Sequence, residues 1–189
     1  MMRRRPFRRP PVPRTPRPLL RANAMMDRGE FAEAARLFDR LAIEARRRSM
    51  PVRAANLALR AAQAYLAQGE VETAMAWLQR TMRVLARHGQ GERVAQIVAR
   101  SGDELRERGY AAQAADLERF AKDALSDTLV SLEDLRASRL GRVAAVQGSL
   151  PGRCEGCGAP LIPEDVTWHD LETAECPYCG TMAKTVAKR

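Results

Sequence analysis

The chain has 189 residues, 46% of them hydrophobic, which is enough for one ordinary domain with a small appendage. Its 32 lysines and arginines outnumber 23 acids, and this positive charge alone would point to nucleic acid as a partner. No apolar run approaches the roughly 18 residues of a membrane span, and no apolar segment of a secretory signal is present, so we expect a cytoplasmic protein without a membrane span.

Residues 1–18 are predicted to be a disordered arm rich in arginine and proline. Residues 1–21 hold eight arginines and no acid, whereas the 24 basic residues of the remainder are nearly balanced by the 23 acids. The prolines disfavour a helix and favour extended conformations. Such an arm suits the phosphates of RNA, a ribosome or DNA. A solvated, nonspecific tail and a misplaced translation start remain open alternatives.

Residues 19–142 have the composition of helices. No proline occurs between residues 52 and 150, where alanine, leucine, arginine, glutamate and glutamine dominate. Gly29, Gly69 and Gly109 recur at intervals of forty, with apolar residues at helical spacing on both sides of each. The pattern predicts an all-α array of three helix hairpins, in which each glycine adopts the left-handed conformation where the first helix ends.

The residues around these glycines resemble the tetratricopeptide repeat (TPR) over about residues 19–125. A small residue follows each glycine by five positions, and a large residue precedes it by four; these are Ala34, Ala74 and Ala114, and Met25, Tyr65 and Leu105. The resemblance implies a stacked array whose inner face binds a peptide or protein. The interval of forty, Thr81 at a small apolar position and Glu118 at a buried position depart from the family pattern.

Two further expectations follow for the array. Leu129 to Leu140 are predicted to form a helix that covers the third repeat. Arginines of the first helices, including Arg53, Arg60 and Arg100, can line a groove for acidic peptides, or they can form a solvated face.

A linker over residues 143–152 is predicted to precede a module over residues 153–183, which is followed by a basic tail over residues 184–189. The only cysteines are Cys154, Cys157, Cys176 and Cys179, and their two Cys-x-x-Cys pairs predict a tetrahedral zinc site. A glycine follows each pair and is expected to have a positive φ. The stretch from Cys154 to Gly180 resembles a zinc ribbon or a rubredoxin-type knuckle pair, so iron is the alternative metal. Disulfides are a further alternative, disfavoured in a reducing cytoplasm.

The module is expected to contain a small β-hairpin. Val166–Trp168 and Thr173–Glu175 read as its strands, with His169 in the exposed turn between them. The apolar residues expected to form its core are Leu161, Ile162, Val166, Trp168 and Tyr178. With one base against six acids, residues 152–183 carry a formal charge of −5, which favours a protein over nucleic acid as the partner of this module.

The sequence does not predict an enzyme. His88 and His169 are the only histidines, neither lies beside a nucleophile motif, and no phosphate-binding glycine loop occurs. We therefore expect a non-enzymatic, protein-binding adaptor in which the TPR-like array and the zinc ribbon are two docking modules. The alternative is a nucleic-acid- or ribosome-associated factor that binds phosphate through the arm. The sequence does not indicate an oligomeric state.

Overall fold

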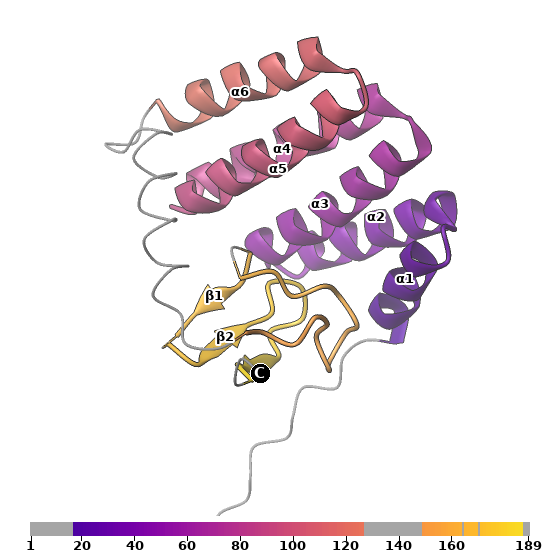
Figure 1. The fold of residues 1–189 in the computed structure, drawn as a ribbon, viewed down its shortest axis with the longest axis vertical. Helices are drawn as coiled ribbons and strands as arrows, with labels where there is room; N and C mark the ends of the chain where they lie inside the picture. Colours follow the sequence, from indigo (N-terminus) through magenta and orange to yellow (C-terminus); the bar gives the residue numbers. More distant parts are fainter. Residues whose placement is uncertain (1–16, 127–148, 164, 170, 187–189) are drawn as a thin grey trace, which may run out of the picture.

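The computed structural model describes residues 17–126, 149–163, 165–169 and 171–186. These residues form six packed helices followed by a small three-stranded antiparallel sheet (Figure 1). A helical array followed by a small β module was predicted. The helices are α1 (Arg17–Asp27), α2 (Phe31–Arg47), α3 (Pro51–Gln68), α4 (Val71–Arg87), α5 (Gly91–Glu107) and α6 (Ala111–Leu125). Most of the predicted arm, the helix expected over Leu129–Leu140 and most of the linker lie outside the described residues.

The helices are joined by five turns spaced twenty residues apart, and one residue in each turn has a positive φ. These residues, with φ in degrees, are Gly29 (76), Ser49 (57), Gly69 (83), Gly89 (68) and Gly109 (86). In the third turn, Gly69 N–H donates to Leu66 O and Glu70 N–H donates to Tyr65 O, both at 3.0 Å. The other four turns repeat these two hydrogen bonds, which are those of a Schellman C-cap. The left-handed conformation predicted for Gly29, Gly69 and Gly109 is thus confirmed.

The three predicted hairpins are present: α1 packs on α2, α3 on α4 and α5 on α6. Helix α2 also packs on α3, which joins the first hairpin to the second. Ala34, Ala74 and Ala114 are fully buried, as small residues at helix contacts should be. Glu118 does not enter the core: it forms a 2.7 Å ion pair with Arg106 while its neighbour Leu117 is fully buried.

The first helix begins slightly earlier than expected. It starts at Arg17, within the predicted arm, and Pro18 lies in its first turn. Proline is tolerated there because the amide that it lacks has no partner within a helix. The other described helices follow the predicted helix–turn–helix order.

The C-terminal module contains β1 (Thr167–Trp168), β2 (Thr173–Glu175) and β3 (Met182–Lys184). β2 lies in the middle and pairs antiparallel with both neighbours. The hairpin of β1 and β2 matches the predicted strands, but the sequence reading missed β3. None of the described helices is long and apolar enough to cross a bilayer.

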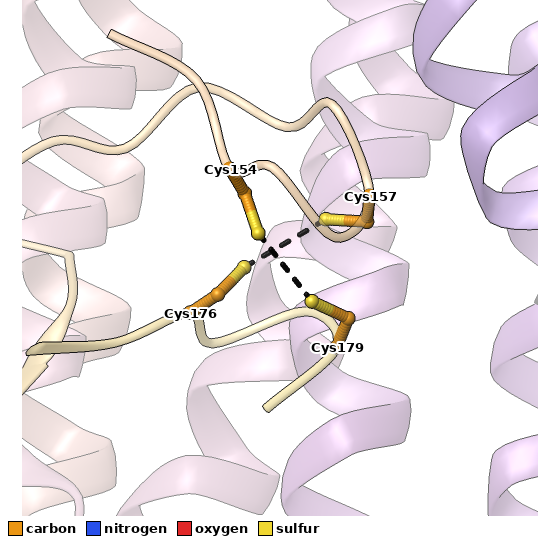
Figure 2. Close-up of side chains that lie close together, drawn as sticks. All are labelled: Cys154, Cys157, Cys176 and Cys179. Carbon is orange, nitrogen blue, oxygen red and sulfur yellow. Dashed lines mark hydrogen bonds between the residues drawn. The ribbon is translucent and has the colours of Figure 1, made fainter. Parts of the chain in front are cut away.

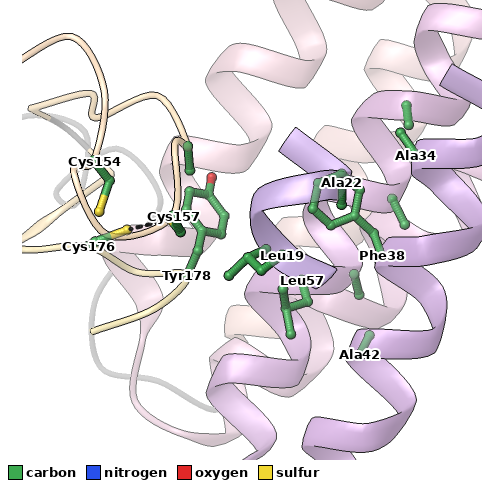
Figure 3. Close-up of a cluster of buried hydrophobic side chains, with 14 of the residues drawn as sticks. Leu19, Ala22, Ala34, Phe38, Ala42, Leu57, Cys154, Cys157, Cys176 and Tyr178 are labelled. Atoms are coloured by element: carbon green, nitrogen blue, oxygen red, sulfur yellow. Dashed lines mark hydrogen bonds between the residues drawn. The ribbon is translucent and has the colours of Figure 1, made fainter. Parts of the chain in front are cut away.

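The buried side chains form two clusters. One spans α3 to α6. The other joins α1, α2 and α3 to the C-terminal module, so that Leu19, Phe38 and Leu57 share a core with Tyr178 and the cysteines (Figure 3). Leu161 and Val166 are buried in this shared core as well, while Ile162 and Trp168 are half-buried. The module therefore does not have the separate small core that was expected.

Candidate metal centre and its contacts with the helices

The four cysteine side chains converge from two turns of the C-terminal module (Figure 2). Cys154 Sγ lies 3.6 Å from Cys179 Sγ, and Cys157 Sγ lies 3.7 Å from Cys176 Sγ. All four sulfur atoms lie within 4.8 Å of one another and no disulfide joins them. A tetrahedral zinc ion with Zn–S bonds of about 2.3 Å places its sulfurs about 3.8 Å apart. The four cysteines therefore fit a tetrahedral metal ion.

The two Cys-x-x-Cys turns, which we call the first and second knuckle, have the same backbone geometry. In the first, Cys154 N–H donates to Ala159 O and Gly158 N–H donates to Cys154 O, both at 2.8 Å. In the second, the corresponding bonds join Cys176 to Thr181 and Gly180 to Cys176, both at 2.9 Å. Gly158 and Gly180 have φ of 72° and 78°, which confirms the expected turns. The repeated geometry aims both sulfurs of each knuckle at one point.

The surroundings of the sulfur atoms favour a cation. Hydrogen bonds with Cys176 and Cys179, together with burial, raise the pKa of Cys157. Hydrogen bonds with Cys157 and Cys176 lower the pKa of Cys179. Four thiolates within 4.8 Å of one another repel each other, and a bound dication would compensate their charge. Because four thiolates fill a tetrahedral coordination shell, the donor set suits a structural ion.

Neither histidine joins this cluster. His169 is exposed, as expected, and its Nε2 lies 3.0 Å from Glu175 Oε2. His88 is exposed at the C-terminal end of α4. Among the described residues, the group able to hold a metal ion contains cysteines alone.

The knuckles are held by side chains of the helical array. In α1, Asn23 donates through Nδ2 to Cys157 O at 2.9 Å, and its Oδ1 accepts from Arg60 of α3 at 3.0 Å. In α3, Asn56 donates to Pro177 O at 2.8 Å and accepts from Arg93 of α5 at 3.0 Å. Each knuckle thus receives one amide hydrogen bond, and each amide is fixed by an arginine of the next odd-numbered helix.

These contacts follow a spacing of 33 residues, both from Asn23 to Asn56 and from Arg60 to Arg93. The glycines repeat every forty residues, seven more than this spacing. The second residue of each pair therefore lies seven positions closer to the N-terminus of its helix than the first residue does. Seven residues are about two helical turns, or roughly 10 Å, so the side chains stay on one face while the contacts move along it. The C-terminal module therefore runs obliquely across α1, α3 and α5.

The array arginines that we expected to line a groove or to form a solvated face lie at this same face. Arg60 is buried, with its guanidinium carbon 5.4 Å from the centre of the Phe38 ring and 5.7 Å from that of Tyr178. Arg100 forms an ion pair with the buried Asp165 of the module, whose carbonyl oxygen accepts from Arg93. Arg53 lines a 310 Å³ cavity beside the second knuckle. The acidic partner of Arg100 is thus the chain's own C-terminal module.

Sequence reasoning missed the two asparagines, although they leave a signal. Asn23 and Asn56 are the only asparagines in the chain, and both stand inside helices, where asparagine is a poor former. Both are buried. A buried amide must find partners, so an isolated asparagine on the apolar face of a predicted helix indicates a specific polar contact.

Comparisons with known proteins leave the chain without an assigned family. No protein-family model, no curated protein and no solved structure matches the chain. The resemblance to the tetratricopeptide repeat therefore stays a prediction.

Proposed function

We propose that the protein is a non-enzymatic, protein-binding adaptor, built from a TPR-like helical array and a structural zinc ribbon that act as one rigid unit. The observation that carries this proposal is the pair of hydrogen bonds from Asn23 and Asn56 to the two knuckles. They tie both halves of the metal centre to the array, as expected for an ion that holds a scaffold together.

Zinc is the proposed metal because four cysteine thiolates and a tetrahedral arrangement are its usual structural site. Iron in a rubredoxin-like centre is the alternative, since it accepts the same ligands. The two differ in colour, and metal analysis of reduced protein purified without added metal separates them.

The adaptor proposal is tested by affinity purification of the full chain from its native cell, with and without nuclease. The matched control is the Cys154→Ser/Cys157→Ser double variant, which loses two ligands and leaves the array sequence unchanged. A protein partner recovered in constant ratio after nuclease treatment, and lost with the double variant, supports the proposal. Recovery of nuclease-sensitive material alone contradicts it.

A second candidate function is the binding of nucleic acid, and one observation supports it. A cavity of 530 Å³ between α1 and α2 is lined by four arginines, Arg17, Arg21, Arg36 and Arg40, and by one acid, Glu33. The first two stand at the point where the arginine-rich arm joins the array. Guanidinium groups arranged in this way suit successive backbone phosphates.

This second function predicts salt-sensitive retention of RNA or DNA. Removing residues 1–16 and, separately, replacing Arg36 and Arg40 by glutamine should each weaken binding and reduce its salt dependence. The exposed Arg83 and Arg87 of α4, replaced in the same way, form the charge-matched control. If full-length protein retains no nucleic acid at moderate salt, this function is wrong.

A further inference from the structure

A third cavity, distinct from the metal centre, lies between α2, α3 and α4 and has a volume of 160 Å³. It exists because small residues face one another where three helices meet: the buried Ala54, Ala55 and Ala58 of α3 lie opposite Ala42 of α2. Trp77 and Val84 of α4 complete an apolar wall. An apolar cavity of about 150 Å³ can hold a molecule the size of benzene.

One buried polar atom in this wall lacks a partner. Thr81 is only 1% exposed, and its Oγ1 makes no hydrogen bond within the described residues. An unsatisfied buried hydroxyl is costly, and a valine of the same shape would avoid the cost. Thr81 is also the residue that departs from the small apolar residue expected at this position. A ligand atom that accepts a hydrogen bond would satisfy it after a small movement of the wall, because the oxygen itself has almost no accessible surface.

Two cations flank the same cavity. Arg46 of α2 and Arg80 of α4 both line it and are exposed. The guanidinium carbon of Arg80 lies 5.7 Å from the centre of the Trp77 ring, which orients the group beside the cavity. In the part of the chain that the structure describes, neither arginine forms an ion pair; the nearby Glu44 pairs with Arg48 instead. The flanking charge is therefore positive.

We propose that this cavity binds an apolar carboxylate. A phenyl-sized or short branched body occupies the space over the alanines, one carboxylate oxygen accepts from Thr81 Oγ1, and the guanidinium groups of Arg46 and Arg80 pair with the negative charge. Two sources supply this chemistry, a free aryl- or alkyl-carboxylic acid and the C-terminal residue of a peptide. The proposal does not rest on the adaptor or zinc functions, although Ala42, Ala54 and Ala58 belong to the same buried cluster as the cysteines.

The experiment is calorimetric titration of the full, metal-loaded chain with two probe pairs. One pair is 3-phenylpropionate and its primary amide; the other is a short peptide ending in phenylalanine with a free or an amidated C-terminus. The proposal expects the free acids to bind at least tenfold more tightly than the matching amides. Saturation by 3-phenylpropionate alone identifies a small-molecule site, and saturation by the peptide alone identifies a chain-terminus site. If neither acid binds at millimolar concentration, the proposal is overturned.

Three substitutions test the assigned contacts. Arg80→Gln should weaken acid binding about tenfold and leave amide binding unchanged, whereas Arg87→Gln, on the same helix but outside the cavity, should change neither. Thr81→Val should weaken acid binding about tenfold while raising the melting temperature, a combination that a damaged fold cannot produce. Equal losses from Arg80→Gln and Arg87→Gln, or unchanged acid binding by Thr81→Val, would overturn the assignment.

Discussion

The side-chain amide of Asn23 donates a 2.9 Å hydrogen bond to the carbonyl oxygen of Cys157, 134 residues later in the chain. Asn23 is 2% exposed, and its amide oxygen accepts from the buried Arg60. One asparagine side chain therefore hydrogen-bonds both the first knuckle and a buried guanidinium. It is the position at which we expect the contact between array and C-terminal module to be most sensitive.

Replacing Asn23 by alanine should lower the free energy of unfolding by about 2–3 kcal/mol, because a buried carbonyl and a buried guanidinium each lose a partner. Chemical denaturation with the metal bound measures this change. Asn23→Asp keeps an acceptor for Arg60 but cannot donate to Cys157, so it isolates the contact with the knuckle. Gln113→Ala on α6 is the control, with an expected change within about 0.5 kcal/mol. A loss no larger than that of the control would contradict the proposed role of Asn23.

Metal removal should destabilise the helices as well as the C-terminal module, because the cysteines share a buried cluster with Leu19, Phe38 and Leu57. We expect chelation to lower the melting temperature by roughly 10 °C or more and to reduce the near-ultraviolet circular dichroism of Tyr178 and Trp168. In the Cys154→Ser/Cys157→Ser variant, the chelator should have no further effect. Equal masses for the reduced protein under native and denaturing conditions would rule out the metal.

The turns predict opposite effects of two substitutions. Ser49 is a non-glycine residue with φ of 57°, so Ser49→Gly should relieve strain and stabilise the fold by up to about 1 kcal/mol. Gly69 has φ of 83° and open space at the position that a Cβ would occupy, so Gly69→Ala should cost about 1 kcal/mol through the backbone alone. Thermal unfolding of both variants checks the signs.

A second glycine is the control for this pair. Gly102 lies inside α5, where its added Cβ would meet only the flexible end of the Arg106 side chain. Gly102→Ala should therefore stabilise the helix by about 0.5–1 kcal/mol. If Gly69→Ala and Gly102→Ala shift stability in the same direction, the left-handed assignment at Gly69 is wrong.

Stability should fall between pH 10 and pH 12 because of Tyr65. Burial and the 3.0 Å hydrogen bond to Asp39 raise the pKa of Tyr65 from 10.0 to about 12. In this window the unfolded chain has lost the phenol proton and the folded chain keeps it, so each rise in pH favours unfolding. Tyr65→Phe should make the curve flatter over this range.

Absorbance titration gives an independent reading of the same group. The folded protein should show a phenolate transition near pH 12 that is missing in Tyr65→Phe. Burial raises the pKa of Tyr178 as well, so the wild-type titration must be compared with that of Tyr65→Phe. If the transition that Tyr65→Phe removes lies near the ordinary phenol value of about 10, the assignment is wrong.

The sequence predicted those features that local chemistry constrains. A helix that ends in a left-handed residue favours glycine, so Gly29, Gly69 and Gly109 revealed the hairpins. Ser49 has the same conformation without being glycine, and it was therefore missed. The four cysteines were found because metal ligands are restricted in residue type and spacing.

The docking of the module on the array could not be predicted in the same way. Asn23 donates to the backbone carbonyl of Cys157. Every residue has such a carbonyl, so the contact requires no particular residue type at position 157. Arg60 and Arg100 were expected either to line a groove for an acidic peptide or to form a solvated face, since a charge pattern shows the sign of a partner but not the molecule that carries it. The cavity beside Thr81 was signalled only by a hydroxyl where a small apolar residue was expected.

The shared core has a consequence for the order of folding during synthesis. Leu19 and Asn23 are made early, whereas their partners Cys157 and Tyr178 are made more than 130 residues later. Contacts of such long range form late, since the closing loop must first be ordered. The nascent array must therefore keep the face formed by α1, α3 and α5 open to solvent until both knuckles have emerged. If the proposed ion binds at that moment, its supply decides whether the N-terminal helix is fixed against the module.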